Sequence, residues 1–212
     1  MLTKQEIRIS DLNAQKLLQR PLKMHIRIFL FRTFLLLLVI LFQACASIPT
    51  SKAAIRTVTG TITKVTDGDT IHLTTPEQTK LKIRLYGIDA PETDKINNKT
   101  GRVNIPGQPY GEESMNALAN KIMDKKVKVD ILDIDKYRRM VCMIYLDDRN
   151  INLEMIRDGY AEAFVEYLKP PYREEFLAAE REAQSARKGI WSLPDYERPR
   201  VYRKRLKISG GE

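Results

Sequence analysis

Residues 57–65 have the sequence Thr-Val-Thr-Gly-Thr-Ile-Thr-Lys-Val, and the turn signal Asp-Gly follows at positions 67–68. β-Branched residues dominate this run, which is typical of a strand that ends in a turn. Residues 81–85, Leu-Lys-Ile-Arg-Leu, alternate apolar and charged side chains with the two-residue period of a strand that buries one face. The sequence from 56 to 85 therefore predicts several short β-strands at the start of a folded domain.

A helix and two further strands are predicted next. Apolar residues recur at helical spacing in a single stripe made of Met115, Leu118, Ala119, Ile122 and Met123. Before this helix, the polar, Gly- and Pro-containing residues 93–109 predict a long surface loop. The remaining predicted elements are strands over 126–132 and 139–146 and helices over 152–158 and 172–188. This order of elements favours an α+β domain built on one small barrel.

The composition is that of a globular protein with a mildly basic body. The chain has 212 residues, of which 43% are hydrophobic and 30% are charged, and these values exclude wholesale disorder. The formal net charge of +9 is compatible with a polyanionic partner, but residues 1–46 carry much of the excess. Charge alone therefore does not identify a nucleic-acid-binding protein.

The N-terminal segment has the pattern of a secretory signal peptide. Basic residues precede the apolar run 34–42, and small residues follow it. This run is roughly half of the ~20 residues that a membrane-spanning helix needs, so a spanning helix is not expected. Either Met1 or Met24 begins the chain. A start at Met24 would give the signal a more usual length and make residues 1–23 a dispensable extension.

Cys45 has two interpretations. Leu-Phe-Gln-Ala-Cys at 41–45 resembles a bacterial lipoprotein box, which predicts lipidation of Cys45 and attachment to a membrane. Ala-Cys-Ala at 44–46 also matches an ordinary signal-peptide cleavage site, which predicts a secreted protein. The expected organisation is an N-terminal extension and signal segment over 1–46, a tether over 47–55, a folded domain over 56–192 and a basic, mobile tail over 193–212.

Three polar clusters interrupt the predicted elements, and each has an ordinary structural explanation when it is taken alone. Asp-Gly-Asp-Thr at 67–70 is common turn chemistry. Asp89 and Glu92 are compatible with charges on a surface loop. Arg138 and Arg139, at the start of a predicted strand, are typical of a solvated strand edge.

Taken together, the clusters offer the groups that phosphodiester hydrolysis needs. Asp69 and Asp89, at the ends of neighbouring strands, supply the oxygen ligands that Ca²⁺ prefers. Glu92 lies three residues beyond Asp89, close enough to act on a metal-held water. Arg84 lies on the strand face opposite the apolar side chains, where it is available to an anion, and a second arginine would complete a clamp on phosphate.

The same motifs, in this order and at these spacings, resemble the staphylococcal nuclease (thermonuclease) family. They are Val-Thr-Asp-Gly-Asp-Thr at 65–70, Arg-Leu-Tyr-Gly-Ile-Asp-Ala-Pro-Glu at 84–92 and Asp-Lys-Tyr-Arg-Arg at 135–139. The resemblance extends over residues 56–191. It implies an α+β fold in which a small five-stranded OB-fold barrel carries about three helices.

The resemblance also implies a role for each matching residue. The implied roles are Ca²⁺ binding by Asp69, Asp89 and the backbone carbonyl of Ala90, general-base catalysis by Glu92, and phosphate binding by Arg84 and Arg139. Tyr137 stands where the family packs a tyrosine near the nucleotide, although a core or surface aromatic residue is an equal alternative.

Two positions depart from the family pattern. Ala90 stands where the family often has Thr, and a carbonyl ligand survives that change. Arg138 stands where the family usually has Gly, a residue that suits a tight turn. We expect Arg138 either to shift this turn or to compete for the phosphate, so the assignment of Arg139 depends on the shape of the turn.

The sequence thus predicts an exported, Ca²⁺-dependent nuclease that hydrolyses DNA or RNA by in-line attack of water and leaves 3′-phosphate ends. No protein partner is implied, and a monomer is expected. The alternative is a non-catalytic OB-fold lipoprotein that binds nucleic acid at the cell surface. The enzyme is favoured because the chain retains the complete set of Asp69, Arg84, Asp89, Glu92 and Arg139.

Overall fold

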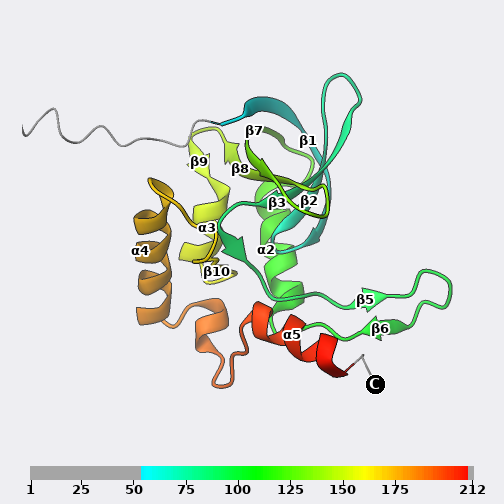
Figure 1. Cartoon of the computed structure of the whole chain (residues 1–212), viewed down its shortest axis with the longest axis vertical. Helices are drawn as coiled ribbons and strands as arrows, with labels where there is room; N and C mark the ends of the chain where they lie inside the picture. Colours follow the sequence, from blue (N-terminus) through cyan, green and yellow to red (C-terminus); the bar gives the residue numbers. More distant parts are fainter. Residues whose placement is uncertain (1–53, 210–212) are drawn as a thin grey trace, which may run out of the picture. The chain divides into compact units, whose positions relative to one another are not determined.

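The computed structural model describes residues 54–209, and Figure 1 shows how their helices and strands are arranged. The predicted signal segment over 1–46, with Cys45 and both candidate start residues, lies outside the described residues. Residues 47–53 of the predicted tether lie outside them as well. Within residues 54–209, no helix combines the length and the apolar character that crossing a membrane requires.

Five strands close into a small barrel. They are β1 (Arg56–Asp67), β2 (Thr70–Thr74), β3 (Lys80–Leu85), β7 (Lys126–Ile134) and β8 (Met140–Leu146). Antiparallel ladders join them in the order β3-β2-β1-β7-β8, and a parallel pairing of β3 with β8 closes the ring. The short strand β9 (Arg149–Asn150) extends the sheet beyond β8. The predicted barrel of OB-fold type is therefore confirmed.

Alternating apolar residues fill the barrel, as the two-residue period predicts. Ile62 on β1, Ile71 and Leu73 on β2, and Ile83 on β3 are fully buried, whereas Lys82 is exposed. Successive side chains on a strand point to opposite faces, so every second residue enters the barrel. Burial of each such side chain contributes about 1.5–3 kcal/mol of hydrophobic stabilisation.

The three predicted helices are present, and two of them pack directly on the barrel. They are α2 (Gly111–Ile122), which packs on β1, α3 (Ile151–Arg157), which packs on β8, and α4 (Tyr172–Ser185), which packs on α3. The buried side chain of Asn152 ties α3 to the strands. Its Oδ1 accepts from the Ile144 amide at 2.9 Å, and its Nδ2 donates to the carbonyls of Tyr86 at 2.9 Å and Cys142 at 3.0 Å. This network fixes the segment that follows β3.

A short ladder positions the residues that come next. The segment β4 (Ile88–Asp89) pairs antiparallel with β10 (Glu162–Ala163), and Asp89 lies opposite Glu162. Gly87 allows the chain to turn between β3 and β4 because it has a φ of +74°, in the left-handed region. A Cβ atom at Gly87 would also lie only 2.6 Å from Cδ2 of Leu168. A side chain at position 87 would therefore displace β4 and with it Asp89.

The loop predicted over 93–109 contains a small hairpin. Its strands are β5 (Lys95–Ile96) and β6 (Val103–Ile105), which pair antiparallel. Strands of two and three residues are too short to show a clear two-residue period, so the sequence gives no signal for them.

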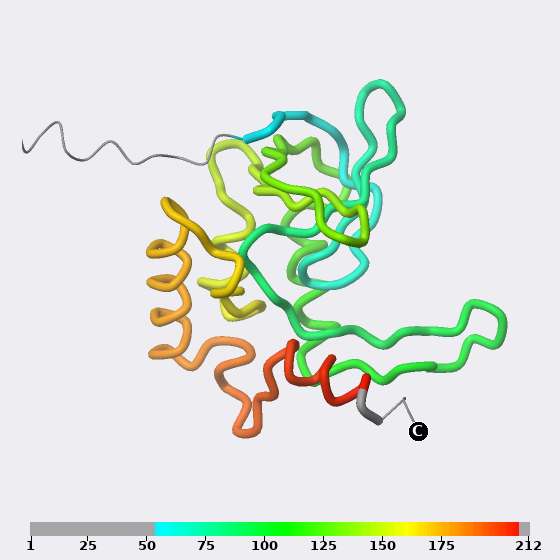
Figure 2. The backbone as a smooth tube through the Cα atoms, viewed as in Figure 1, coloured from blue at the N-terminus to red at the C-terminus, as the bar shows by residue number. Residues whose placement is uncertain are grey.

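The prediction of a mobile tail is wrong for residues 199–209, which form the helix α5 (Pro199–Ser209). Pro199 begins this helix at a position where its missing N–H group is not needed. Tyr202 is buried, and its hydroxyl donates to the carbonyl of Pro106. Helix α5 consequently lies beside the β5–β6 loop (Figure 2). The prediction of a mobile tail followed from the many basic residues, and it gave no weight to Tyr202, the buried side chain that anchors the helix.

Candidate active site

The turn between β1 and β2 places Asp69 at the end of the barrel. The amide of Asp69 donates to Oδ1 of Asp67 at 3.1 Å, which is the local bonding of an Asx turn. Gly68 is buried, and a Cβ atom there would meet Oγ of Ser114 at 1.9 Å and Cβ of Ala90 at 2.7 Å. Close packing thus requires glycine at position 68. The motif at 67–70 forms a turn, and the same turn places Asp69 in the site.

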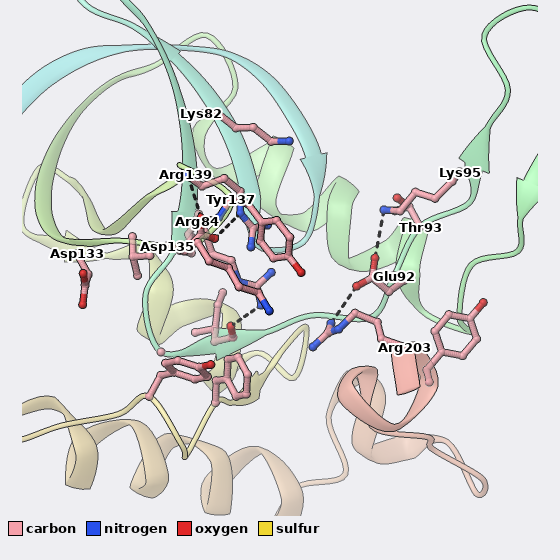
Figure 3. A pocket seen from close by; sticks show the side chains of 18 of the residues that line it. Lys82, Arg84, Glu92, Thr93, Lys95, Asp133, Asp135, Tyr137, Arg139 and Arg203 are labelled. Carbon is pink, nitrogen blue, oxygen red and sulfur yellow. Dashed lines mark hydrogen bonds and ion pairs between the residues drawn. The ribbon is translucent and has the colours of Figure 1, made fainter. Parts of the chain in front are cut away.

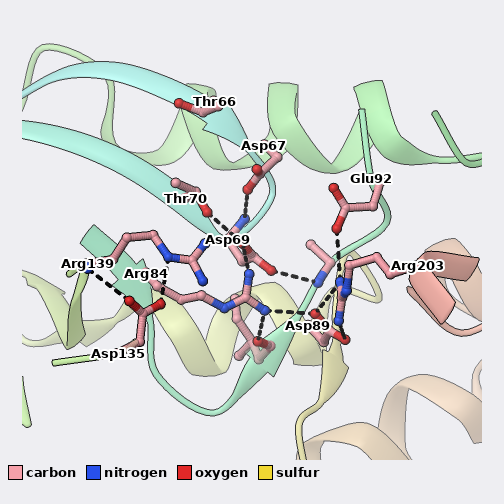
Figure 4. A network of polar contacts seen from close by, with 12 residues as sticks. Thr66, Asp67, Asp69, Thr70, Arg84, Asp89, Glu92, Asp135, Arg139 and Arg203 are labelled. Carbon is pink, nitrogen blue, oxygen red and sulfur yellow. Dashed lines mark hydrogen bonds and ion pairs between the residues drawn. The ribbon is translucent and has the colours of Figure 1, made fainter. Parts of the chain in front are cut away.

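Arg84 bridges two buried carboxylates. It stands on β3 directly opposite Thr70, so its side chain lies next to Asp69. Nη1 of Arg84 donates to Oδ1 of Asp69 at 2.6 Å, and Nη2 donates to Oδ1 of Asp89 at 2.7 Å (Figure 4). Asp69 is 2% exposed and Asp89 is 0% exposed. The guanidinium group of Arg84 therefore compensates part of the charge of both carboxylates, which could not be buried alone.

The remaining oxygens of Asp69 are also hydrogen-bonded, and this sets its charge. Oδ2 accepts from the amide of Ala90 at 3.2 Å, and Oδ1 accepts from the hydroxyl of Thr70 at 2.9 Å. Burial by itself would raise the pKa of Asp69, but Arg84 and these hydrogen bonds hold that pKa below its usual range. Burial and the charge of Asp69 together raise the pKa of Asp67 to about 7. Asp69 is therefore ionised at neutral pH, whereas Asp67 is only partly ionised there.

Glu92 extends from the loop after β4 toward the same space. Its backbone is fixed by Gln108, whose Oε1 accepts from the Glu92 amide at 3.1 Å and whose amide donates to the Glu92 carbonyl at 2.7 Å. Its carboxylate contacts two cations, Nη1 of Arg203 at 2.9 Å and Nζ of Lys95 at 3.2 Å (Figure 3). The position of Glu92 beside Asp89 is as the sequence predicts, but the pairing with Arg203 was not expected.

The turn between β7 and β8 brings Arg139 to the site. Oδ1 of Asp135 accepts from the amides of Tyr137 and Arg139, each at 2.9 Å, and Oδ2 accepts from Nε of Arg139 at 2.7 Å. Figures 3 and 4 both place the Arg139 side chain next to Arg84. The second arginine of the predicted clamp is therefore positioned by its own turn. Tyr137 lies at the rim and is 64% exposed.

Arg138 adopts the backbone conformation that glycine would favour. Its φ is +62°, and its amide donates to the carbonyl of Asp135 at 2.9 Å. The tight turn is retained, at a cost of about 1–2 kcal/mol for a non-glycine residue in the left-handed region. Arg138 is exposed and is not among the residues that line the cleft, so its expected competition for phosphate finds no support in its position.

Arg84, Glu92, Arg139 and Arg203 line one open cleft of about 870 Å³ between β3, the β5–β6 loop, the β7–β8 turn and α5. Asp69 and Asp89 are buried and are not among the lining residues. Its basic lining residues are Lys82, Arg84, Lys95, Lys136, Arg139, Arg203 and Lys207. Apolar and aromatic side chains, including Tyr137, Phe164 and Tyr167, lie among them. Basic groups neutralise phosphates and aromatic rings stack on bases, so the cleft suits a nucleic-acid strand.

The oxygen atoms of the site are of the kind that binds Ca²⁺, but cationic side chains already contact the carboxylate oxygens. Asp69, Asp89 and the Ala90 carbonyl offer the oxygen atoms that this ion prefers. In residues 54–209, however, no three His, Cys, Asp or Glu side chains are arranged as a metal-binding group. The carboxylate oxygens accept from Arg84 and Arg203 instead. A divalent cation at these oxygens would compete with the guanidinium groups.

Sequence reasoning missed two members of the site, Arg203 and Lys95. Arg203 contacts residues more than one hundred positions away in the chain, and no local sequence pattern predicts such a contact. Lys95 lies three residues after Glu92, but this segment is not helical, so the spacing alone does not predict the contact. The only feature of the sequence that draws attention to Arg203 is the basic run from Arg198 to Lys207, and this run predicts a mobile tail instead of a part of the site.

Comparison with known proteins gives a consistent result. A family model described as staphylococcal nuclease homologue matches residues 82–193. Endonuclease Htp3 of Saprolegnia parasitica is 34% identical over 170 residues, which cover 71% of this chain and 77% of that protein. An uncharacterized endonuclease of Haemophilus influenzae is 30% identical over 148 residues, covering 70% and 74% of the two chains. A probable staphylococcal-like nuclease of rice, CAN3, is 38% identical over 125 residues, covering 59% of this chain and 29% of that protein.

Proposed function

This chain belongs to the staphylococcal nuclease family, and from that premise we propose that it is a Ca²⁺-dependent nuclease that hydrolyses DNA, RNA or both. Relatives named as endonucleases support the nuclease activity. The observation that carries the proposal is the arrangement of Arg84, Asp69 and Asp89 in one buried network, with Glu92 and Arg139 on the same cleft. A module that only binds nucleic acid has no need for a buried network of this kind.

The chain's own residues supply the parts of an in-line hydrolysis. Asp69, Asp89 and the Ala90 carbonyl would hold Ca²⁺, which when bound polarises a phosphoryl oxygen. Arg84 and Arg139 balance the charge that builds on the phosphoryl group. Glu92 takes a proton from the attacking water as its oxygen bonds to phosphorus. The bond from phosphorus to the 5′ oxygen breaks, and this oxygen takes a proton from solvent water, which leaves a 3′-phosphate on one fragment and a 5′-hydroxyl on the other.

We predict that activity requires Ca²⁺. The described residues 54–209 contain one histidine, His72, and one cysteine, Cys142, which is buried, so a site built from nitrogen or sulfur ligands is not available there. Purified protein should digest plasmid DNA and RNA with Ca²⁺ and lose this activity in excess chelator. The fragments should accept label at their 5′ ends from polynucleotide kinase without prior dephosphorylation. Full digestion in chelator, or full rescue by Zn²⁺ alone, would rule out the proposed ion.

We also propose that the protein is exported, because of the predicted signal segment over 1–46. Mass spectrometry of the mature N-terminus distinguishes the two interpretations of Cys45. An acylated Cys45 identifies a lipoprotein attached to a membrane, and a chain that begins at Ser47 identifies a secreted protein. A mature protein that retains residues 1–40 would contradict both.

A further inference from the structure

Helix α5 lies outside the part of the chain that the family model matches, yet it reaches the centre of the site. The match ends at residue 193, and α5 begins at Pro199. From this helix Arg203 extends to the carboxylates (Figure 4). Its Nη2 donates to Oδ2 of Asp89 at 2.7 Å, and its Nη1 donates to Oδ1 of Asp89 at 3.1 Å and to Oε1 of Glu92 at 2.9 Å.

Independent contacts hold α5 in this position. The hydroxyl of Tyr202, the residue next to Arg203, donates to the Pro106 carbonyl. Just before the helix, the carbonyl of Glu197 accepts from Nε2 of Gln108 at 2.8 Å. Gln108 is the residue that also fixes the backbone of Glu92. Helix α5 is thus attached to the loop that carries Glu92, and the approach of Arg203 is not a chance contact of a loose tail.

With Arg203 in place, every carboxylate oxygen of Asp89 and Glu92 contacts a cationic side chain. Both oxygens of Asp89 accept hydrogen bonds from Arg203, and Oδ1 accepts a further one from Arg84. Glu92 contacts Arg203 through Oε1 and Lys95 through Oε2. The site as it stands is balanced in charge without a metal.

We propose that Arg203 is a resident counter-ion of Asp89 and Glu92, and that a divalent cation binding at these oxygens displaces it. A divalent cation and the Arg203 guanidinium group would compete for the lone pairs of the same oxygen atoms, and their charges repel. Removal of Arg203 without a substitute would leave Asp89 buried and partly uncompensated, so the exchange is favourable only when a cation arrives. Binding of the cation therefore releases Oε1 of Glu92 from Arg203, while Oε2 keeps its contact with Lys95. The inference rests on the proposed function, because it assumes that the carboxylates bind a cation.

Calcium titration by calorimetry of the full chain and three variants tests the exchange. Arg203→Gln removes the competing charge, and we expect its Ca²⁺ dissociation constant to fall by about 10- to 100-fold, the size expected for charged hydrogen bonds. Arg203→Lys keeps the charge but loses the two-pronged contact, so its affinity should lie between those of Arg203→Gln and the parent. Lys204→Gln is the matched control, because Lys204 is exposed on the same helix and is not among the cleft residues. Its affinity should equal that of the parent.

Hydrogen exchange of the same proteins gives a second reading. In the parent, Ca²⁺ should increase exchange of the amides of residues 200–207, and without Ca²⁺ these amides should exchange faster in Arg203→Gln than in the parent. Binding of Ca²⁺ by the parent with an unchanged or weaker affinity in Arg203→Gln would overturn the inference and leave the proposed function intact. Absence of Ca²⁺ binding in both proteins would overturn the calcium site and the exchange together.

Discussion

Replacement of Glu92 by Gln is expected to reduce turnover by ~10²–10⁴-fold, the usual effect of losing a general base. The amide has the same shape as the carboxylate but cannot take the proton of the attacking water. The fold should be preserved, because Gln108 holds residue 92 through backbone groups. Turnover is measured on a defined oligonucleotide at saturating Ca²⁺, and binding of the same oligonucleotide is measured separately.

Binding distinguishes a catalytic role from a structural one. Glu92→Gln should bind the oligonucleotide about as well as the parent, since it loses no cationic contact to phosphate. Glu112→Gln provides the control, because Glu112 is an exposed residue in the first turn of α2 and does not line the cleft. This control should keep the parent rate. Equal losses of binding and turnover in Glu92→Gln would indicate that Glu92 positions the substrate or the cation instead of accepting a proton.

Replacement of Arg84 by Ala is expected to lower turnover by ~10²–10³-fold, the range seen when one group that stabilises transition-state charge is removed. The structure adds a second consequence. Arg84 bridges Asp69 and Asp89, and its loss leaves two buried carboxylates without their shared cation. Breaking a buried ion pair from one side typically costs about 3–5 kcal/mol. Thermal unfolding of this variant should therefore show a clear loss of stability.

Arg84→Lys separates the two consequences. A lysine keeps the positive charge and should recover part of the stability, but a point charge cannot contact two carboxylates and a phosphate as a guanidinium group does. Turnover should stay well below the parent value. Arg102→Ala removes an arginine that is exposed in the β5–β6 loop and should change neither property. A folded Arg84→Lys variant with the parent rate would contradict the role of Arg84 in catalysis.

The parts of the site that the sequence predicts correctly lie in local motifs on predictable strands. The two-residue period of residues 81–85 places Arg84 on the face away from the barrel core, and the turn after β1 places Asp69 opposite the end of β3. Strand register then brings Arg84 next to Asp69, whereas the place of Asp89 also depends on its pairing with the distant strand β10. The same reasoning explains why the barrel and its first three helices could be predicted.

The parts that the sequence could not predict depend on contacts between distant segments. Arg203 meets Asp89 and Glu92 only because Tyr202 anchors α5 on the β5–β6 loop, and one buried tyrosine in a basic segment is a weak signal. The left-handed conformation of Arg138 was unpredictable for a different reason. Hydrogen bonds that the neighbouring amides of Tyr137 and Arg139 donate to Oδ1 of Asp135 impose it on a residue that does not favour it.

The most direct test of the proposed function is a single-turnover cleavage assay with enzyme in excess over one end-labelled oligonucleotide. The parent protein and Glu92→Gln are compared at saturating Ca²⁺ and under conditions in which both bind the whole of the substrate. We predict that the parent cleaves the bound strand to 5′-hydroxyl and 3′-phosphate ends, and that Glu92→Gln retains the strand and cleaves it at least about 100-fold more slowly. A parent protein that binds the strand without cleaving it, or a folded Glu92→Gln variant that cleaves at the parent rate, would contradict the proposal.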